Sequence, residues 1–136
     1  IYGKDWTGKV PQSLIGQQFI PNNELPSLYR SSKIVLNDHR PDMRKRGFYS
    51  NRLFDAVASG ARVLGDDVVG IEKFFEGAVK SYADSSELRG ICADENLGSW
   101  GTGDQIRDRA IAFGKRHSFE SRAQEMIQAV HQWRKP

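Results

Sequence analysis

The sequence predicts an α/β fold in which a parallel sheet is flanked by helices and the last third of the chain is helical. Short apolar runs alternate with amphipathic segments through residues 1–95, a pattern typical of parallel strands joined by crossover helices. Beyond them, apolar residues recur only at helical spacing. Because 136 residues make one ordinary domain, we expect residues 1–136 to form a single domain.

The strands are predicted from short apolar runs bounded by polar or turn-forming residues. Three of them follow one another at residues 33–37, 61–65 and 78–82. A further short strand is expected at residues 14–20, directly before a proline. The charged segment that runs from the end of the 33–37 strand to Gly47 is expected to be a loop.

The helices are predicted from capping residues that precede apolar residues at helical spacing. The clearest helix begins after Ser50 and runs to Ser59, and Gly60 stands where a left-handed residue ends a helix. Pairs of polar residues three positions apart form capping boxes at the start of two later helices. These other helices are expected after Asn22 or Asn23, at Ile71 to Phe75, and after Asp84, Thr102 and Ser118.

The composition is that of a folded globular protein with a mild positive charge. Twenty Lys and Arg residues against 17 Asp and Glu give a net charge of +3, which is too small to argue for a nucleic-acid partner. The excess lies in the first half of the chain, where the simplest interpretation is a solvated loop. The basic cluster consists of Arg40, Arg44, Lys45, Arg46 and Arg52.

Several classes of protein are excluded by what the sequence lacks. Its one cysteine, Cys92, permits no internal disulfide and no cysteine-based zinc site, and we expect it to pack in the core. No apolar run reaches the roughly 18 residues of a membrane span, which leaves room only for a peripheral membrane contact. Because no leader-like segment is visible either, we expect a cytoplasmic protein.

The junction between the 33–37 strand and the helix after Ser50 is a candidate phosphate site. Ligands of parallel α/β sheets bind beyond the carboxyl ends of the strands, and a helix N-terminus presents unpaired N–H groups with a partial positive charge. Gly47 allows the backbone to approach a ligand closely. His39, in the same loop, is a candidate for contact with a ligand, and no partners at metal-ligand spacing accompany it.

The first turns of this helix carry side chains suited to a phosphorylated sugar. Ser50 and Asn51 can donate hydrogen bonds, Arg52 can pair with a phosphate, and Asp55 can accept bonds from sugar hydroxyls. An alternative interpretation stays open at this point. Ser50 then only caps the helix, and Asp55 is an exposed helical acid without a ligand.

The order of several sequence stretches resembles a known family. The stretches are IYG, GQQFIPNNELPSLYRSSKIVLN, GFYSNRLFDAVASGARVLGDD, VVGIEKFF and, near the end, HSFESRAQEMI. Together they resemble the C-terminal domain of GT-B glycosyltransferases, most closely a bacterial branch with an Asn-Arg-x-Phe-(Glu/Asp)-Ala-x-Ala-x-Gly helix. The resemblance covers nearly the whole chain, and its most specific part is Ser50 to Gly60.

This resemblance implies a Rossmann-like domain that binds the nucleotide-diphosphate sugar donor. In this family the donor-binding domain is paired with an N-terminal acceptor domain, which commonly carries the catalytic groups. The donor-binding domain of the family also starts one strand and one helix before the position that matches Ile1. We therefore expect a donor-binding part of a metal-independent glycosyltransferase that needs no cofactor and is inactive alone. The alternatives are a non-catalytic nucleotide-binding or regulatory domain, a nucleic-acid binder that uses the basic loop, and a partner-binding helical face.

The resemblance also assigns roles to single positions. Asp55 matches the acidic residue that holds the donor ribose, and Arg52 matches a basic position near the phosphates. Gly47 stands where many members carry a second acidic residue that contacts the donor sugar. The remaining matches are the backbone of Phe48, Tyr49, Ser50 and Asn51, which meets the diphosphate, and the stretch Phe19-Ile20-Pro21, which flanks the base.

Overall fold

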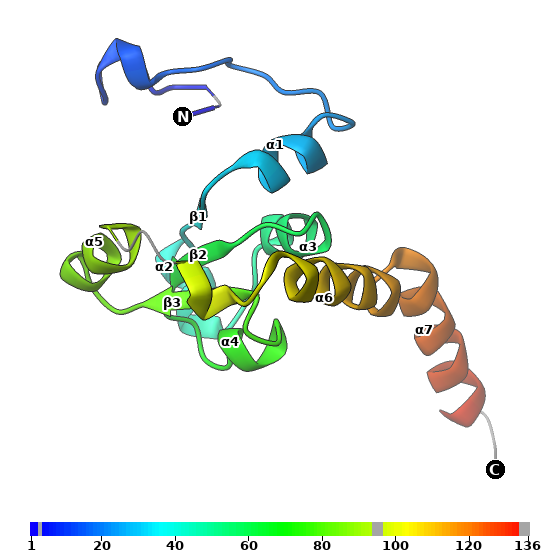
Figure 1. Ribbon diagram of the computed structural model, residues 1–136. Coiled ribbons are helices and arrows are strands. Elements are labelled where there is room, and N and C mark those ends of the chain that lie inside the picture. Colours follow the sequence, from blue (N-terminus) through cyan, green and yellow to red (C-terminus); the bar gives the residue numbers. More distant parts are fainter. Residues whose placement is uncertain (3, 94–96, 134–136) are drawn as a thin grey trace.

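The computed structural model describes residues 1–2, 4–93 and 97–133, and within them it confirms the α/β prediction (Figure 1). Three parallel strands form a sheet in the order β1-β2-β3. Their bounds are β1 Val35–Asn37, β2 Val63–Asp66 and β3 Val79–Tyr82, and Val63 of the central strand pairs with Val35 and Val79. The domain is Rossmann-like, since helices flank this parallel sheet.

Helices connect the strands and form the last third of the described chain. The α-helices are α1 Leu25–Ser31, α2 Pro41–Arg46, α3 Asn51–Ala58, α4 Ile71–Phe74, α5 Ser85–Ala93, α6 Gly103–Arg116 and α7 Phe119–Trp133. Two short 3₁₀ helices, η1 Gln12–Leu14 and η2 Leu97–Trp100, complete the elements. The predicted strands at 33–37, 61–65 and 78–82 are therefore confirmed, although each is shorter than expected.

The helix predicted after Ser50 is confirmed as α3, and its local signals act as expected. The Ser50 hydroxyl oxygen accepts a hydrogen bond from the Arg52 N–H at 3.3 Å, which caps the first turn. Gly60 follows the helix with a left-handed φ of 80°. The apolar side of α3 is buried against the sheet and α6 through Leu53, Ala56 and Val57.

An aromatic cluster joins the core to the turn before α3. Phe75 is fully buried, and its ring lies 5.1 Å from Phe54, 5.4 Å from Phe113 and 5.5 Å from Tyr49 between centroids. Tyr49 is held a second time, because its hydroxyl donates to the carbonyl oxygen of Val69 at 2.9 Å. The turn that leads into α3 is therefore fixed by the aromatic core and by this hydrogen bond at the surface.

The segment from Asn37 to Gly47 was expected to be a loop, and this expectation is wrong in part because the segment contains α2. Pro41 occupies the first helical position, where its missing N–H costs nothing, and Gly47 ends the helix with a left-handed φ of 70°. Three basic residues in the last turn favour the carbonyl end of the helix dipole. These start and stop signals are present in the sequence.

The strand expected at residues 14–20 is wrong as well. Leu14 ends the short η1 helix, residues 15–20 have no strand structure, and Phe19 is 71% exposed. Figure 1 shows the N-terminal segment, in blue, lying apart from the sheet, with α1 between them. An isolated apolar run without a neighbouring strand cannot satisfy its backbone groups as a strand does.

One expectation about a buried residue is also corrected, because Cys92 is exposed on α5, a helix without buried residues. The apolar stripe of α7 is exposed in this chain, with Phe119, Met126 and Val130 at 97%, 70% and 48%. Figure 1 shows why, because α7 extends away from the sheet. Among the described residues, no helix combines the length and apolar character that crossing a membrane requires.

Candidate functional site

A cavity of about 610 Å³ opens at the carboxyl ends of β1 and β2. These two strands are neighbours in the sheet, so the loops that follow them meet at one edge. The cavity walls combine carboxylates with basic side chains. They are formed by Asp38, His39, Pro41, Arg44, Lys45, Asp66, Asp67 and Val69.

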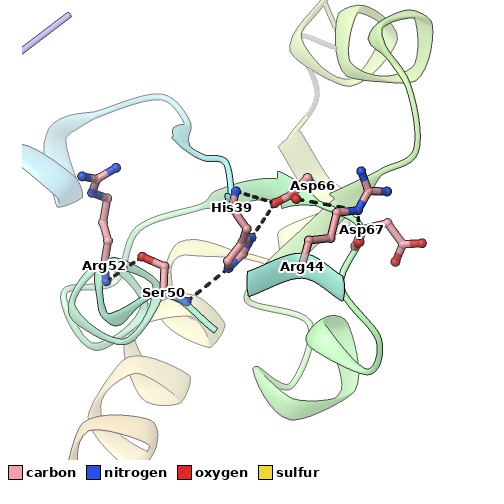
Figure 2. A network of polar contacts seen from close by, with 6 residues as sticks. All are labelled: His39, Arg44, Ser50, Arg52, Asp66 and Asp67. Carbon is pink, nitrogen blue, oxygen red and sulfur yellow. Dashed lines mark hydrogen bonds and ion pairs between the residues drawn. The ribbon is translucent and has the colours of Figure 1, made fainter. Parts of the chain in front are cut away.

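Asp66 is the last residue of β2 and ties the two loops together (Figure 2). One of its carboxylate oxygens, Oδ1, accepts two hydrogen bonds from His39, at 3.1 Å from the backbone N–H and at 2.5 Å from Nδ1. Both side chains are almost completely shielded from solvent, with 0% of His39 and 4% of Asp66 exposed. A buried carboxylate needs such partners to compensate for the loss of its hydration.

The second nitrogen of the His39 ring reaches the start of α3. The backbone N–H of Ser50 donates a hydrogen bond to Nε2 of His39 at 3.1 Å. A backbone N–H can only donate, so Nε2 must carry its lone pair and the ring proton must sit on Nδ1. The Asp66 carboxylate accepts that proton, and the three groups therefore form one consistent chain of donors and acceptors.

Arg44 of α2 closes the other side of Asp66. Its Nε donates to the backbone oxygen of Asp67 at 2.9 Å and lies 3.9 Å from the second carboxylate oxygen of Asp66. The guanidinium partly neutralises the buried carboxylate and fastens α2 over the end of β2. Arg44 nevertheless stays half exposed at the cavity.

Tyr82 is the last residue of β3 and stands at the same edge of the sheet, where its surroundings shift its pKa. Burial raises the pKa of its phenol above the ordinary value of 10.0, and the negative charges of Asp38 and Asp66 raise it further, against a smaller opposite effect of Arg44. The phenol therefore stays protonated at neutral pH.

The turn before α3 keeps two backbone donors unengaged. The N–H of Phe48 donates to Met43 and that of Ser50 to His39, while the N–H of Arg52 donates to the Ser50 hydroxyl. Within the described parts of the chain, the N–H groups of Tyr49 and Asn51 have no acceptor. Two free N–H groups at a helix N-terminus suit a negatively charged ligand.

The predicted site residues that lie near one another are Gly47, Phe48, Tyr49, Ser50, Asn51 and His39. A Cβ added to Gly47 would meet no atom within 4 Å, so this side of the turn is open. Asp55 and Arg52 are exposed on α3, and Figure 2 shows the Arg52 guanidinium pointing away from His39. Ile20 lies in the chain between η1 and α1 and is half-buried.

Sequence reasoning did not single out Asp66 or the side chain of Asn37. Asp66 directly follows the buried run of β2, and a polar residue at that place is a signal that could have identified it. Asn37 ends β1 and is 3% exposed, and neither polar atom of its amide has a partner among the described residues. Within the same described residues, no group of three or more His, Cys, Asp or Glu side chains is placed to hold a metal ion.

A comparison with known proteins gives this architecture a family. The model of a family described as glycosyl transferase-like matches residues 1–128. The chain therefore belongs to the glycosyl transferase-like family. Membership supports a role in glycosyl transfer and implies a nucleotide sugar as the donor substrate. No curated protein and no solved structure matches the chain significantly.

Proposed function

We propose that the chain is the donor-binding domain of a GT-B glycosyltransferase of the bacterial branch, and that it holds a nucleotide-diphosphate sugar for transfer to an acceptor. The observation that carries this proposal is the pair of unengaged N–H groups of Tyr49 and Asn51 at the N-terminus of α3. They adjoin the carboxyl ends of two parallel strands in a chain of a glycosyl transferase-like family. Such a junction is where α/β domains bind phosphates.

Each exposed group of α3 then has a role toward the donor. The two free N–H groups donate to the diphosphate, and the open side of Gly47 lets the phosphates approach the backbone. Arg52 is exposed, and its guanidinium has no partner among the described residues, which leaves it free for a phosphate. Asp55 lies about one turn after Arg52 on the exposed side of α3, and its carboxylate accepts hydrogen bonds from the ribose hydroxyls.

The leaving diphosphate is stabilised in this proposal by the helix dipole, the free N–H groups and basic side chains rather than by a metal ion. The acceptor and the catalytic groups belong to a second domain, and the complete enzyme works in the cytoplasm in glycan synthesis. These 136 residues should therefore bind a donor without transferring its sugar. Robust sugar transfer by the chain alone would contradict this part of the proposal.

Calorimetric titration with UDP, GDP and dTDP in the absence of metal tests the donor site. We expect saturable binding of one of them, and we expect Asp55→Ala to weaken it by about tenfold or more, because a carboxylate hydrogen bond is lost. The matched control is Asp108→Ala, which removes a 76% exposed acid from α6 and should leave the affinity unchanged. No binding of any diphosphate, or equal losses in both variants, would overturn the proposal.

A further inference from the structure

We propose that Asp66 and His39 act as a positioning pair that holds the N-terminus of α3 in the arrangement that binds the donor diphosphate. This inference rests on the proposed function and deepens it. Asp66 ends β2 and His39 lies two residues after β1, and in the described part of the chain the hydrogen bonds of the pair reach the start of α3 through the Ser50 backbone. Neither side chain needs to touch the donor to set the geometry of the groups that do.

The orientation of the His39 ring is fixed by a hydrogen bond from the backbone of His39 as well as by one from the ring itself. Both the backbone N–H and Nδ1 of His39 donate to the same oxygen of Asp66. Two bonds from one residue to one atom leave the ring a single favourable rotation. Because the ring is completely buried, solvent cannot offer replacement partners if that rotation changes.

The carboxylate also selects the tautomer of the ring. Asp66 accepts a proton from Nδ1, which leaves Nε2 as an acceptor for the Ser50 N–H. A ring with its proton on Nε2 would place two donors against each other at the start of α3. Asp66 therefore acts on α3 through the ring, over two successive hydrogen bonds.

The hydrogen bond from the Ser50 N–H to His39 also affects the direction of the neighbouring N–H groups, which are the proposed donors to the diphosphate. Ser50 has an extended backbone, with φ −65° and ψ 138°, and successive N–H groups of an extended backbone point in different directions. Holding the Ser50 N–H toward the buried ring thus turns the N–H group of Asn51 away from it. The N–H groups of Tyr49 and Asn51, on either side of Ser50, are the ones in this turn that have no acceptor among the described residues.

The burial of His39 separates this role from direct contact with a ligand. Its two ring nitrogens are both engaged and its side chain has no exposed surface. The sequence-based expectation that His39 contacts the donor is therefore replaced here by an indirect role. Arg44, 3.9 Å from Asp66, offsets the carboxylate charge that would otherwise repel a diphosphate.

Two variants of His39 separate the bond to Ser50 from the bond to Asp66. In His39→Gln the amide oxygen extends about as far as Nε2 and can still accept from the Ser50 N–H. In His39→Asn the shorter amide reaches only the place of Nδ1, so Asp66 keeps a partner while Ser50 loses its acceptor. Both variants are titrated with UDP, GDP and dTDP beside the wild type, and their folding is checked by thermal unfolding.

We expect His39→Gln to bind within about threefold of the wild type and His39→Asn to bind about tenfold more weakly, as the loss of one hydrogen bond predicts. Equal affinities in the two variants would overturn the positioning role. Nitrogen NMR of the wild-type imidazole gives a second test that needs no variant. A protonated Nδ1 and an unprotonated Nε2 are expected, and the opposite pattern would overturn the pair.

The two measurements also distinguish the inference from the proposed function. Binding that is unaffected in both His39 variants leaves the donor site standing and rejects the positioning pair. Absence of diphosphate binding in the wild type rejects the donor site and the role of the pair in it. The imidazole shifts then show separately whether the hydrogen-bonded chain itself exists.

Discussion

Phe75→Ala is expected to lower the free energy of unfolding by about 3–5 kcal/mol, as large-to-small changes at buried aromatic residues do. Phe75 is fully buried, and its ring contacts those of Tyr49, Phe54, Phe74 and Phe113. The substitution removes the centre of this cluster and leaves a cavity that its rigid neighbours cannot fill. The turn before α3 should loosen as well, since Tyr49 loses one of its two aromatic packing partners and keeps Phe74.

Denaturant unfolding followed by circular dichroism measures this loss. The matched control is Phe119→Ala, because Phe119 is 97% exposed at the start of α7. We expect that control to stay within about 0.5 kcal/mol of the wild type, as is usual for exposed positions. Similar losses in the two variants would show that the aromatic cluster is not the core of the fold.

Asp66→Ala is expected to destabilise the chain by about 3 kcal/mol, because it removes one partner from a buried hydrogen-bonded pair. The backbone N–H and Nδ1–H of His39 would both lose their acceptor, and neither can reach water in the native fold. Arg44 would lose its nearby carboxylate at the same time, although its bond to the Asp67 backbone oxygen would remain. The cost therefore comes mainly from unsatisfied donors.

The neighbouring residue provides the control for this prediction. Asp67 carries the same charge one position later, and its side chain is exposed. Its hydrogen bonds are made by its backbone, whose N–H donates to Tyr82 and whose oxygen accepts from Arg44. Asp67→Ala should therefore change the unfolding free energy by less than about 0.5 kcal/mol. A loss in Asp66→Ala no larger than that in Asp67→Ala would show that the buried pair does not support the fold.

The parts of the fold that could be predicted are those whose signals are local. The capping hydroxyl of Ser50, the apolar spacing of α3 and Gly60 behind it lie within a dozen residues, and the structure uses each as expected. The capping box of Thr102 and Gln105 at the start of α6 is confirmed in the same way. Local backbone groups are satisfied by nearby side chains, so such elements need little tertiary information.

The parts that could not be predicted depend on contacts between distant residues. Asp66 and His39 are 27 positions apart, and only the parallel pairing of β1 with β2 brings them together. Residues 14–20 show the reverse error, because an apolar run becomes a strand only where a neighbour completes its hydrogen bonds. The apolar spacing of α7 predicted the helix itself, while nothing in the described chain covers Phe119.

In the proposed function, a donor diphosphate binds the free N–H groups of Tyr49 and Asn51 at the start of α3. The most direct measurement is amide NMR of the isotope-labelled chain during titration with UDP, GDP and dTDP. The N-terminus of α6 serves as an internal control, since the N–H groups of Gly103 and Asp104 also lack an acceptor in the described chain while the acidic side chain of Asp104 in the first turn disfavours an anion there. We predict that one of the three diphosphates shifts the amide signals of Tyr49 and Asn51 and leaves those of Gly103 and Asp104 unchanged. Equal shifts at both helix starts, or none at α3, would contradict the claim.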